Sequence, residues 1–305
     1  MKKGKIVILV IIALAVVVAI ICGFNMLNKN TSKFSNESSK NIAKEEVATE
    51  EETLVTPEEI QIYDIEEGYL TVPYNKDAQK HEYNWDKYLK NNSGFYRYED
   101  DKYKSRIGID VSAYQGNIDW KKVKDAGVEF AILRLGYRGY GDAGNIVLDK
   151  KFEENYVNAK NEGIDIGVYF FSQAISIDEV KEEASFVLEN LKGKNINCPV
   201  VFDLEKIKND VARTDNLTID EITNITLEFC KIIEENGYEA SIYGNAKTFT
   251  TKMELELFNN YNKWYADYQE KPLYIYDFNI WQYTENGKIN GISGNVDIDI
   301  QFVKK

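Results

Sequence analysis

The sequence contains very little histidine and cysteine. Among its 305 residues there are three cysteines and a single histidine, His81. A structural or catalytic zinc site, or a catalytic triad built on histidine, normally draws on more residues of these types. We therefore expect neither a metal nor a cofactor, and any catalysis by this chain has to rely on carboxylates.

Only two of the cysteines, Cys198 and Cys230, lie outside the apolar N-terminal segment. An exported protein could join them in a disulfide. The alternative is two buried thiols that pack as small apolar side chains. We favour the buried thiols.

Positive charge is also in short supply. The chain has 37 lysines and arginines against 50 aspartates and glutamates, which gives a formal net charge of −13. A nucleic-acid partner is therefore not expected, because binding to phosphates depends on neutralising them with basic side chains. The negative charge does not exclude a largely uncharged polymer such as a glycan.

A long uncharged run occurs near the N-terminus. Residues 6–24 carry no charged or strongly polar side chain, and Lys2, Lys3 and Lys5 precede them. A helix needs roughly 20 apolar residues to cross a bilayer, and flanking lysines favour the cytoplasmic side. We predict a transmembrane signal anchor over residues 1–24, with the N-terminus cytoplasmic and the rest of the chain outside at the cell wall. The alternative, a cleaved signal peptide, is disfavoured because the small-residue triplet Ala13–Ala15 lies in the middle of the run.

The composition changes twice after this run. Residues 25–60 are rich in Asn, Ser, Lys, Glu and Thr and read as a flexible stalk, because they cannot bury enough apolar surface to offset the entropy of ordering. Residues 61–104 form a tyrosine-rich extension, whose aromatic side chains suggest packing against the main domain. A separate wall-binding module and a surface for an envelope protein are the alternatives for this extension.

Residues 105–305 show a regular alternation of β-prone and helical stretches. The expected strands are 107–112, 130–137, 166–172, 199–205, 240–243, 263–268, 279–283 and 296–302. The expected helices are 120–126, 150–161, 177–191, 219–236 and a weaker one near 251–258, and glycine follows the first four, as is common at helix ends. This alternation predicts an α/β fold with a parallel sheet, either an irregular TIM-like barrel or an open doubly wound sheet. The first strand is not followed by a glycine-rich phosphate loop, which disfavours nucleotide binding.

Acidic residues occur near the ends of several of the expected strands. Asp203 and Glu205 are two residues apart and therefore share one face of their strand, while apolar Phe202 and Leu204 share the other. The same alternation turns Asp110 inward on the first strand, and Asp297 lies on the last. Acids crowded into one cleft raise each other's pKa, so that one keeps its proton beside an ionised partner, which is the arrangement that glycoside hydrolysis uses.

Aromatic residues and one arginine are expected near the same rim. Sugar rings can rest on aromatic faces, although any single aromatic residue can equally belong to the core. Arg134, with inward parity on the second strand, is expected to face the carboxylates and organise them. The candidate sugar-binding aromatic residues are Tyr169, Tyr243, Trp264, Tyr268 and Trp281.

Residues 107–303 resemble the glycoside hydrolase family 25 lysozymes, the N-acetylmuramidases. The resemblance is carried by stretches that occur in family order, namely GIDVSAYQGNIDWKKVK, FAILRLGYRG, GIDIGVYFFSQA, PVVFDLE, GYEASIYGN, WYADY, IWQYTENGKINGISG and NVDIDIQF. It implies a (β/α)5β3 barrel and cleavage of the β-1,4 bond between N-acetylmuramic acid and N-acetylglucosamine. Some members have histidine after the tyrosine of the third strand where this chain has Phe170, whose outward parity predicts little effect on the chemistry.

The resemblance also implies roles for particular residues. Glu205 would donate the proton. Asp203 would act either as nucleophile or by orienting the acetamido group of the substrate. Asp110 and Asp297 match the other two acids of the family cleft, and Tyr169, Trp264, Tyr268 and Trp281 match its aromatic positions.

Taken together, these features predict a membrane-anchored peptidoglycan hydrolase of the lysozyme type whose substrate is the glycan strand of the cell wall. One alternative is a barrel that binds wall glycan without cutting it. Another is an envelope scaffold that binds a protein partner through residues 61–104. The presence of all four acids favours the enzyme.

Overall fold

The computed structural model describes residues 58–91 and 94–305. The predicted membrane anchor, residues 1–24, and nearly all of the predicted stalk lie outside these described residues. Within them, no helix has the length and apolar character needed to span a bilayer. Glu59 and Ile60, which we had placed at the end of the stalk, are the first residues of strand β1, so the predicted stalk extends too far.

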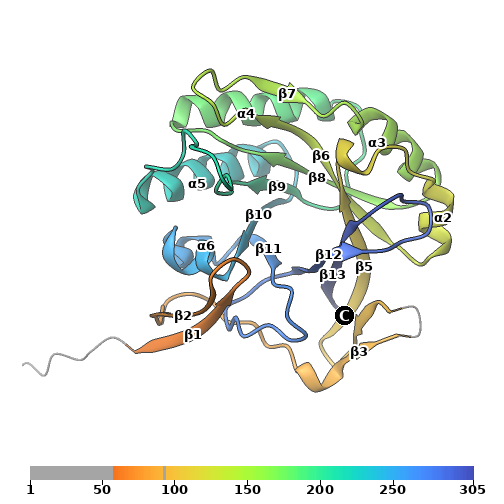
Figure 1. Cartoon of the computed structure of the whole chain (residues 1–305), viewed down its shortest axis with the longest axis horizontal. Coiled ribbons are helices and arrows are strands. Elements are labelled where there is room, and N and C mark those ends of the chain that lie inside the picture. Colours follow the sequence, from red (N-terminus) through yellow and green to blue (C-terminus); the bar gives the residue numbers. More distant parts are fainter. Residues whose placement is uncertain (1–57, 92–93) are drawn as a thin grey trace, which may run out of the picture. The chain divides into compact units, whose positions relative to one another are not determined.

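Eight strands of the described chain form a closed barrel. Their order around the ring is β5, β13, β12, β11, β10, β9, β8 and β6, and pairing between β6 and β5 closes it (Figure 1). The closed ring confirms the barrel and rejects the open sheet. The strands are β5 (Tyr103–Val111), β6 (Phe130–Arg138), β8 (Asp165–Phe171), β9 (Val200–Asp203), β10 (Ala240–Asn245), β11 (Asn262–Ala266), β12 (Ile280–Gly287) and β13 (Val296–Lys304).

One strand of the barrel runs against the others. Strands β5, β6 and β8–β12 pair in parallel, whereas β13 is antiparallel to both of its neighbours. The connection from β12 to β13 spans only residues 288–295, and a parallel return would need a longer crossover. The expectation of a purely parallel sheet is therefore wrong for the last strand. A short strand β7 (Ile146–Leu148) pairs antiparallel with the last residues of β6, beyond the residues that pair with β5.

Helices cover the outside of the barrel along its first strands. They are α2 (Trp120–Asp125), α3 (Phe152–Asn161), α4 (Ile177–Leu191), α5 (Ile219–Glu235) and α6 (Ala246–Thr251), with 3-10 turns at Trp85–Lys87, Ala113–Gln115 and Leu255–Phe258. The two long helices begin at side-chain caps, where Ser176 accepts from the Glu179 amide and Thr218 from the Glu221 amide. The weak helix expected near 251–258 is instead α6 followed by a 3-10 turn.

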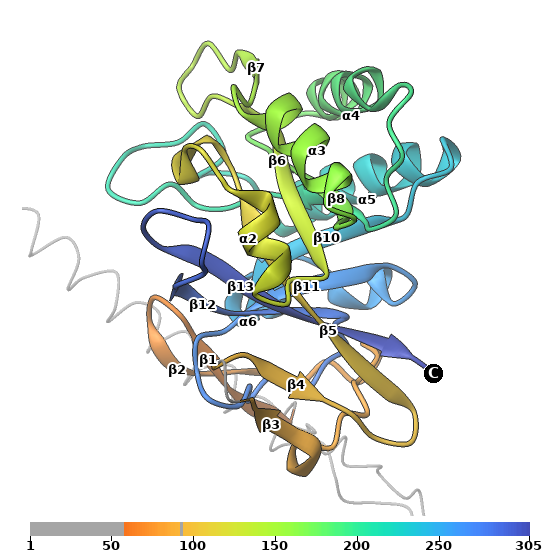
Figure 2. The same cartoon turned by 90° about the vertical axis from the view of Figure 1, so that its right-hand side faces the viewer.

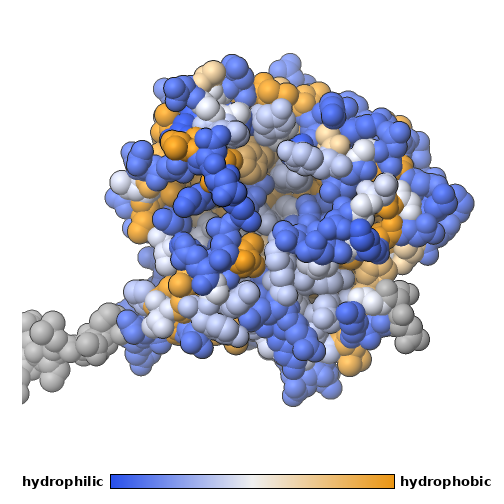
Figure 3. Space-filling model, in the orientation of Figure 1, coloured by the Kyte–Doolittle hydropathy of each residue, from blue (hydrophilic) through white to orange (hydrophobic). Residues whose placement is uncertain are grey.

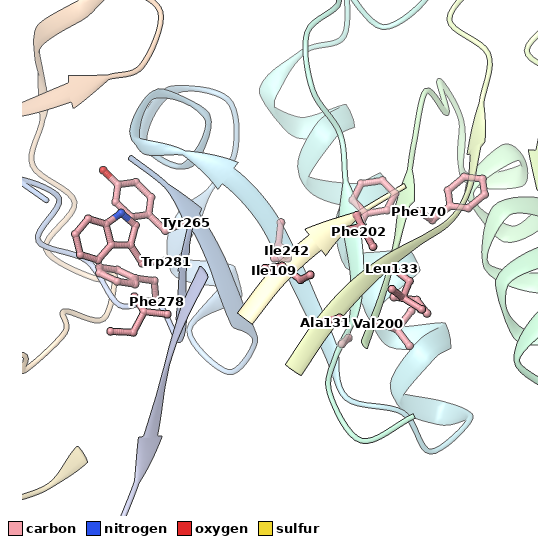
Figure 4. Packing of buried hydrophobic residues seen from close by; sticks show 14 of the residues in the cluster. Ile109, Ala131, Leu133, Phe170, Val200, Phe202, Ile242, Tyr265, Phe278 and Trp281 are labelled. Atoms are coloured by element: carbon pink, nitrogen blue, oxygen red, sulfur yellow. The ribbon is translucent and has the colours of Figure 1, made fainter. Parts of the chain in front are cut away.

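Side chains alternate between the helix-facing side and the interior of the barrel. Phe170 packs on Phe186 of α4, and Phe202 packs on Phe229 of α5 with ring centroids 4.9 Å apart. Figure 4 shows Phe170 and Phe202 among the buried side chains. These contacts confirm the outward parity assigned to Phe170 and Phe202. The interior is filled by a second set of residues: Phe130, Ile132, Cys198, Val201, Tyr243, Trp264, Ala266 and Ile280.

The tyrosine-rich extension packs against the side of the barrel formed by β11–β13, opposite the long helices (Figure 2). It contains two hairpins, β1 (Glu59–Asp64) with β2 (Gly68–Pro73) and β3 (Tyr88–Lys90) with β4 (Tyr96–Tyr98). Tyr83 stacks on Phe302 of β13 at 4.1 Å, and Trp85 meets Trp281 of β12 edge-on at 5.8 Å. The extension thus covers the last strands where helices are missing, which confirms the expected packing on the main domain.

Both cysteines in the described chain are buried and unpaired. Cys198 lies inside the barrel and Cys230 lies in α5, and neither forms a disulfide. Burial raises the pKa of each thiol, to about 11 for Cys198, so both are neutral. The structure confirms the buried thiols and not the disulfide.

Candidate active site

Four carboxyl groups meet at the mouth of the barrel. Asp110 near the end of β5 is the register partner of Asp297 near the start of β13. Asp203 is the last residue of β9, and Glu205 follows in the loop. The observed strand therefore ends two residues before the end predicted for it at residue 205. The face of the molecule drawn in Figure 1 is hollowed at its centre in the space-filling view of Figure 3.

Asp203 and Glu205 form the first carboxyl pair. Their side chains are close enough to share a proton in a hydrogen bond. Burial, and then the charge of Glu205, raises the pKa of Asp203 well above its usual value. Glu205 stays open to solvent from the cleft, yet the protein that surrounds its carboxyl raises its pKa to about 7. The pair therefore holds a proton at neutral pH.

Asp110 and Asp297 form the second pair across the two antiparallel strands. Burial raises the pKa of Asp297 to about 6. Burial, followed by the charges of Asp297 and Asp299, raises the pKa of Asp110 well above its usual value. The charge of Asp297 also raises the pKa of Glu205, so the two pairs lie near enough to interact electrostatically. The mouth thus holds both protonated and ionised carboxyls, as acid-catalysed cleavage of a glycosidic bond requires.

Gln282 connects three of the residues at the mouth. It lies inward on β12, and its side-chain amide donates to Asp110 Oδ2 at 2.8 Å. Its carbonyl oxygen accepts from the hydroxyls of Tyr243 at 3.0 Å and Tyr268 at 2.9 Å. One amide therefore fixes the orientation of an acid and of two tyrosines that line the cleft.

Arg134 points inward on β6, as its parity predicted, but it pairs with a different acid. Two nitrogens of its guanidinium contact one oxygen, Asp149 Oδ2, at 2.8 Å from Nε and 2.7 Å from Nη2. Its direct partner, Asp149, was not predicted, but its charge lowers the pKa of Asp203, so Arg134 faces the mouth acids as expected. Its guanidinium also lies over the rings of Tyr114 and Tyr137.

The aromatic candidates lie at different depths. Tyr169 and Tyr268 are partly exposed at the mouth, and Tyr243 is almost buried there. Trp264 is only 2% exposed and lies deeper, packing against Tyr169 at 5.9 Å and Tyr243 at 4.7 Å between ring centroids. Trp264 therefore supports the tyrosines from below and does not form the sugar-contacting surface expected of it.

Comparison with known proteins gives the family of this barrel. The model of the glycosyl hydrolases family 25 matches residues 109–292. The chain belongs to this family. The match runs from the last three residues of β5 through β12 and includes Asp110, Asp203 and Glu205.

Individual known proteins are also similar to this chain. The autolytic lysozyme of Clostridium acetobutylicum is 26% identical over 193 residues, which are 63% of this chain and 54% of the relative. The chain thus spans about half the length of that curated relative. A bacterial lysozyme from Streptomyces coelicolor has a similar structure at 27% identity and a TM-score of 0.54, covering 64% of this chain and 90% of that one. The modular autolysin LytC from Streptococcus pneumoniae, solved with a synthetic peptidoglycan ligand, shares the fold at 23% identity and a TM-score of 0.59, over 80% of this chain and 56% of that one.

Among the predicted sugar-binding residues, Trp281 differs most from its expected position. It is fully buried on the outer face of β12, where its indole donates to the Asp267 carbonyl at 2.7 Å. Tyr88 and Tyr96 of the extension pack on it (Figure 4 shows Trp281 beside Tyr265 and Phe278). Trp281 therefore cannot line a sugar groove at the mouth. Trp281 was predicted to bind sugar because it matches a family motif. The alternation of side chains along β12 places it on the outer face.

Three residues at or below the mouth were missed from the sequence. Gln282 and Asp299 could have been found by parity, since Gln282 is two residues from Ile280 and Asp299 is two residues from Asp297. Asp299 is fully buried, accepts from the Trp264 indole at 2.8 Å, and has its pKa raised by burial. Asp149 had no comparable signal, because it precedes a helix start and resembles an ordinary cap.

Proposed function

We propose that this protein is a peptidoglycan hydrolase that cleaves the β-1,4 bond between N-acetylmuramic acid and N-acetylglucosamine. The observation that carries the proposal is the presence of two pairs of proton-sharing carboxyls in one cleft of a family 25 barrel, Asp203 with Glu205 and Asp110 with Asp297. Lysozymes among the relatives support the same substrate class.

In this proposal Glu205 protonates the leaving oxygen. It is the most accessible of the four acids, and a pKa of about 7 keeps much of it protonated at neutral pH. Asp203, hydrogen-bonded to it, stabilises the positive charge that develops on the sugar, either as nucleophile or by orienting the acetamido group of the substrate. Once Glu205 gives up its proton, the same carboxylate can accept one from the attacking water.

The remaining residues hold these groups in place. Asp110 and Asp297 keep negative charge at the opposite side of the cleft, and Gln282 fixes Asp110 through a 2.8 Å hydrogen bond. Tyr169, Tyr243 and Tyr268 provide rings and hydroxyls for the sugar. The chemistry therefore needs only side chains of this chain.

The test is release of new reducing ends from purified peptidoglycan by the wild type and by Glu205→Gln. The substitution keeps the shape of the side chain but removes its proton transfer, and we expect a loss of about 10²–10⁴-fold. Mass spectrometry of the wild-type products names the bond, since a muramidase leaves N-acetylmuramic acid at the reducing end. Undiminished release by Glu205→Gln would reject the assignment, and binding without release by the wild type would favour a glycan-binding barrel.

We also propose that residues 1–24 anchor the protein in the membrane with the barrel outside at the cell wall. The support is the uncharged run of residues 6–24 behind three lysines. Fractionation of cells that express the full chain or a chain starting at residue 25 tests it. Recovery of the full chain in the soluble fraction would contradict an uncleaved anchor.

An envelope protein partner would have to use the part of the 61–104 extension that the barrel leaves exposed. Tyr69 and Leu89 are the large side chains available there, at 61% and 68% exposure. Pull-down of envelope proteins with the full chain and with Leu89→Asp tests this proposal, and identical captured sets would count against it.

A further inference from the structure

The hairpin formed by β1 and β2 reaches the catalytic mouth. Its turn, Asp64–Glu66, forms one wall of a cavity of about 350 Å³ that Glu205 and Tyr243 also line. Figure 1 shows the hairpin beside α6, which forms another side of the same cavity. These hairpin residues lie outside the segment matched by the family, 109–292.

The turn is held rigidly in this position. The Asp64 carboxylate accepts from the backbone amides of Glu66 at 3.0 Å and Glu67 at 2.8 Å, which fixes the turn itself. Ile65 packs against the cluster inside the barrel. Glu66 pairs with Lys208 at 3.1 Å and Glu67 pairs with Lys247, so the turn is tied to the loop after β9 and to helix α6. These contacts make the hairpin turn a fixed part of the cleft wall.

The floor and the rim of the cavity differ in chemistry. The floor is aliphatic and aromatic: Phe202, Leu204, Leu217, Ile222, Ile242 and Met253. Lys206 and Lys252 stand at the rim, and within the described part of the chain neither has an acidic partner within ion-pair distance. The Lys247 charge is matched by Glu67 and the Lys208 charge by Glu66. The cavity therefore offers apolar contact below, and above it two lysines that form no direct ion pair, although acids such as Glu66 and Asp215 line the same cavity.

We propose that this side pocket binds the peptide-bearing lactyl substituent of the muramic acid at the cleaved bond. The lactyl group and the first alanine of a wall peptide carry methyl groups, which match the apolar floor, and the residue after them carries a carboxylate, which matches the two lysines. The volume is at the lower end of the range of roughly 300–1,000 Å³ typical of small-ligand sites. The assignment rests on the proposed muramidase function and adds a preference for peptide-bearing strands.

The first experiment compares two substrates with the full chain. One is glycan strands that keep their peptides, and the other is the same strands after an amidase has removed the peptides. We expect kcat/KM to be about tenfold higher on the peptide-bearing strands, with most of the difference in KM, because the added contacts bind the substrate without changing the chemical step. Equal kcat/KM on both substrates would overturn the pocket assignment alone. Cleavage of neither would overturn the proposed function itself.

The second experiment tests whether Lys206 and Lys252 cause the preference for peptide-bearing strands. In the double variant Lys206→Met and Lys252→Met, we expect the ratio of kcat/KM between the two substrates to fall to about one, because the carboxylate loses its partners. Lys231→Met is the matched control, since it removes the same charge from an exposed site on α5. The control should keep the wild-type ratio. A double variant that retains the full preference would overturn the assignment of the peptide to this pocket.

Discussion

The two faces of strand β12 divide the molecule into regions with opposite properties. On the inner face, Gln282 binds Asp110 and two tyrosines at the mouth, among carboxyls whose pKa values are raised by burial. On the outer face, Trp281 lies in an aromatic layer that we define as Tyr83, Trp85, Tyr88, Tyr96, Phe278, Trp281 and Phe302. One residue step along the strand separates a functional site from a structural core.

The two regions have opposite effects on the stability of the fold. Gathering carboxyls in a cleft opposes folding, because each buried charge loses hydration and repels its neighbours. The aromatic layer buries large apolar side chains and favours folding. We infer that packing of the extension on the barrel helps to offset the unfavourable free energy of burying the carboxyls at the mouth. Functional sites commonly lower the stability of a fold in this way.

The largest expected effect is that of a substitution among the carboxyls at the mouth. Asp203→Asn should lower kcat/KM on peptidoglycan by about 10²–10⁴-fold, because an amide can neither act as nucleophile nor orient the acetamido group as the carboxyl does. The melting temperature should stay the same or rise, since the substitution removes a carboxyl whose ionisation is disfavoured by burial. Kinetics and calorimetry on one preparation measure both. A large fall in melting temperature would mean that the mouth also stabilises the fold.

The matching test in the aromatic layer is Trp281→Ala. Removing this fully buried side chain should lower the free energy of unfolding by about 3–5 kcal/mol, while kcat/KM measured well below the melting temperature stays near that of the wild type. Denaturant unfolding and peptidoglycan cleavage check the two halves. A selective rise in KM with unchanged stability would restore the sugar-binding role that the structure rejects.

Gln282→Leu probes the boundary between the regions, because the residue lies one step from Trp281 but faces inward. The substitution leaves the Asp110 carboxyl and the hydroxyls of Tyr243 and Tyr268 without their shared partner. We expect a loss of about 1–3 kcal/mol in the free energy of unfolding together with reduced kcat. Gln282→Glu, which keeps the acceptor but not the donor, serves as comparison. Wild-type kcat in both variants would show that Gln282 does not position the site.

The smallest expected effect concerns pH. Glu205 has to be protonated to act as the acid, so activity should fall as the pH rises through its pKa of about 7. The charge of Glu66 raises that pKa and the charge of Lys208 lowers it, so Glu66→Gln should lower it and move the alkaline limb to lower pH. The shift should be roughly a few tenths of a pH unit, because exposed charges interact by about 0.2–1 kcal/mol. A shift to higher pH in the profile of kcat/KM would contradict this sign.

Much of the fold could be predicted because its signals are local. The helices at Ile177–Leu191 and Ile219–Glu235 follow from apolar periodicity and caps, and they were found almost to the residue. Parity along strands placed Asp110, Asp203 and Arg134 inward correctly. The partner of Arg134 could not be predicted, because Asp149 is brought to it by tertiary packing and its sequence context is that of an ordinary helix start.

The sequence by itself determined the class of fold, the inward parity of the acids and the resemblance that assigned the family. Only the tertiary structure decided the direction of β13, which brings Asp297 opposite Asp110 although it lies at the start of its strand. The tertiary structure also decided that the hairpin of the extension walls a cavity beside Glu205. The physical reason is that periodicity and capping act between near neighbours in the chain, whereas these contacts join residues that are far apart in sequence and meet only when the barrel closes.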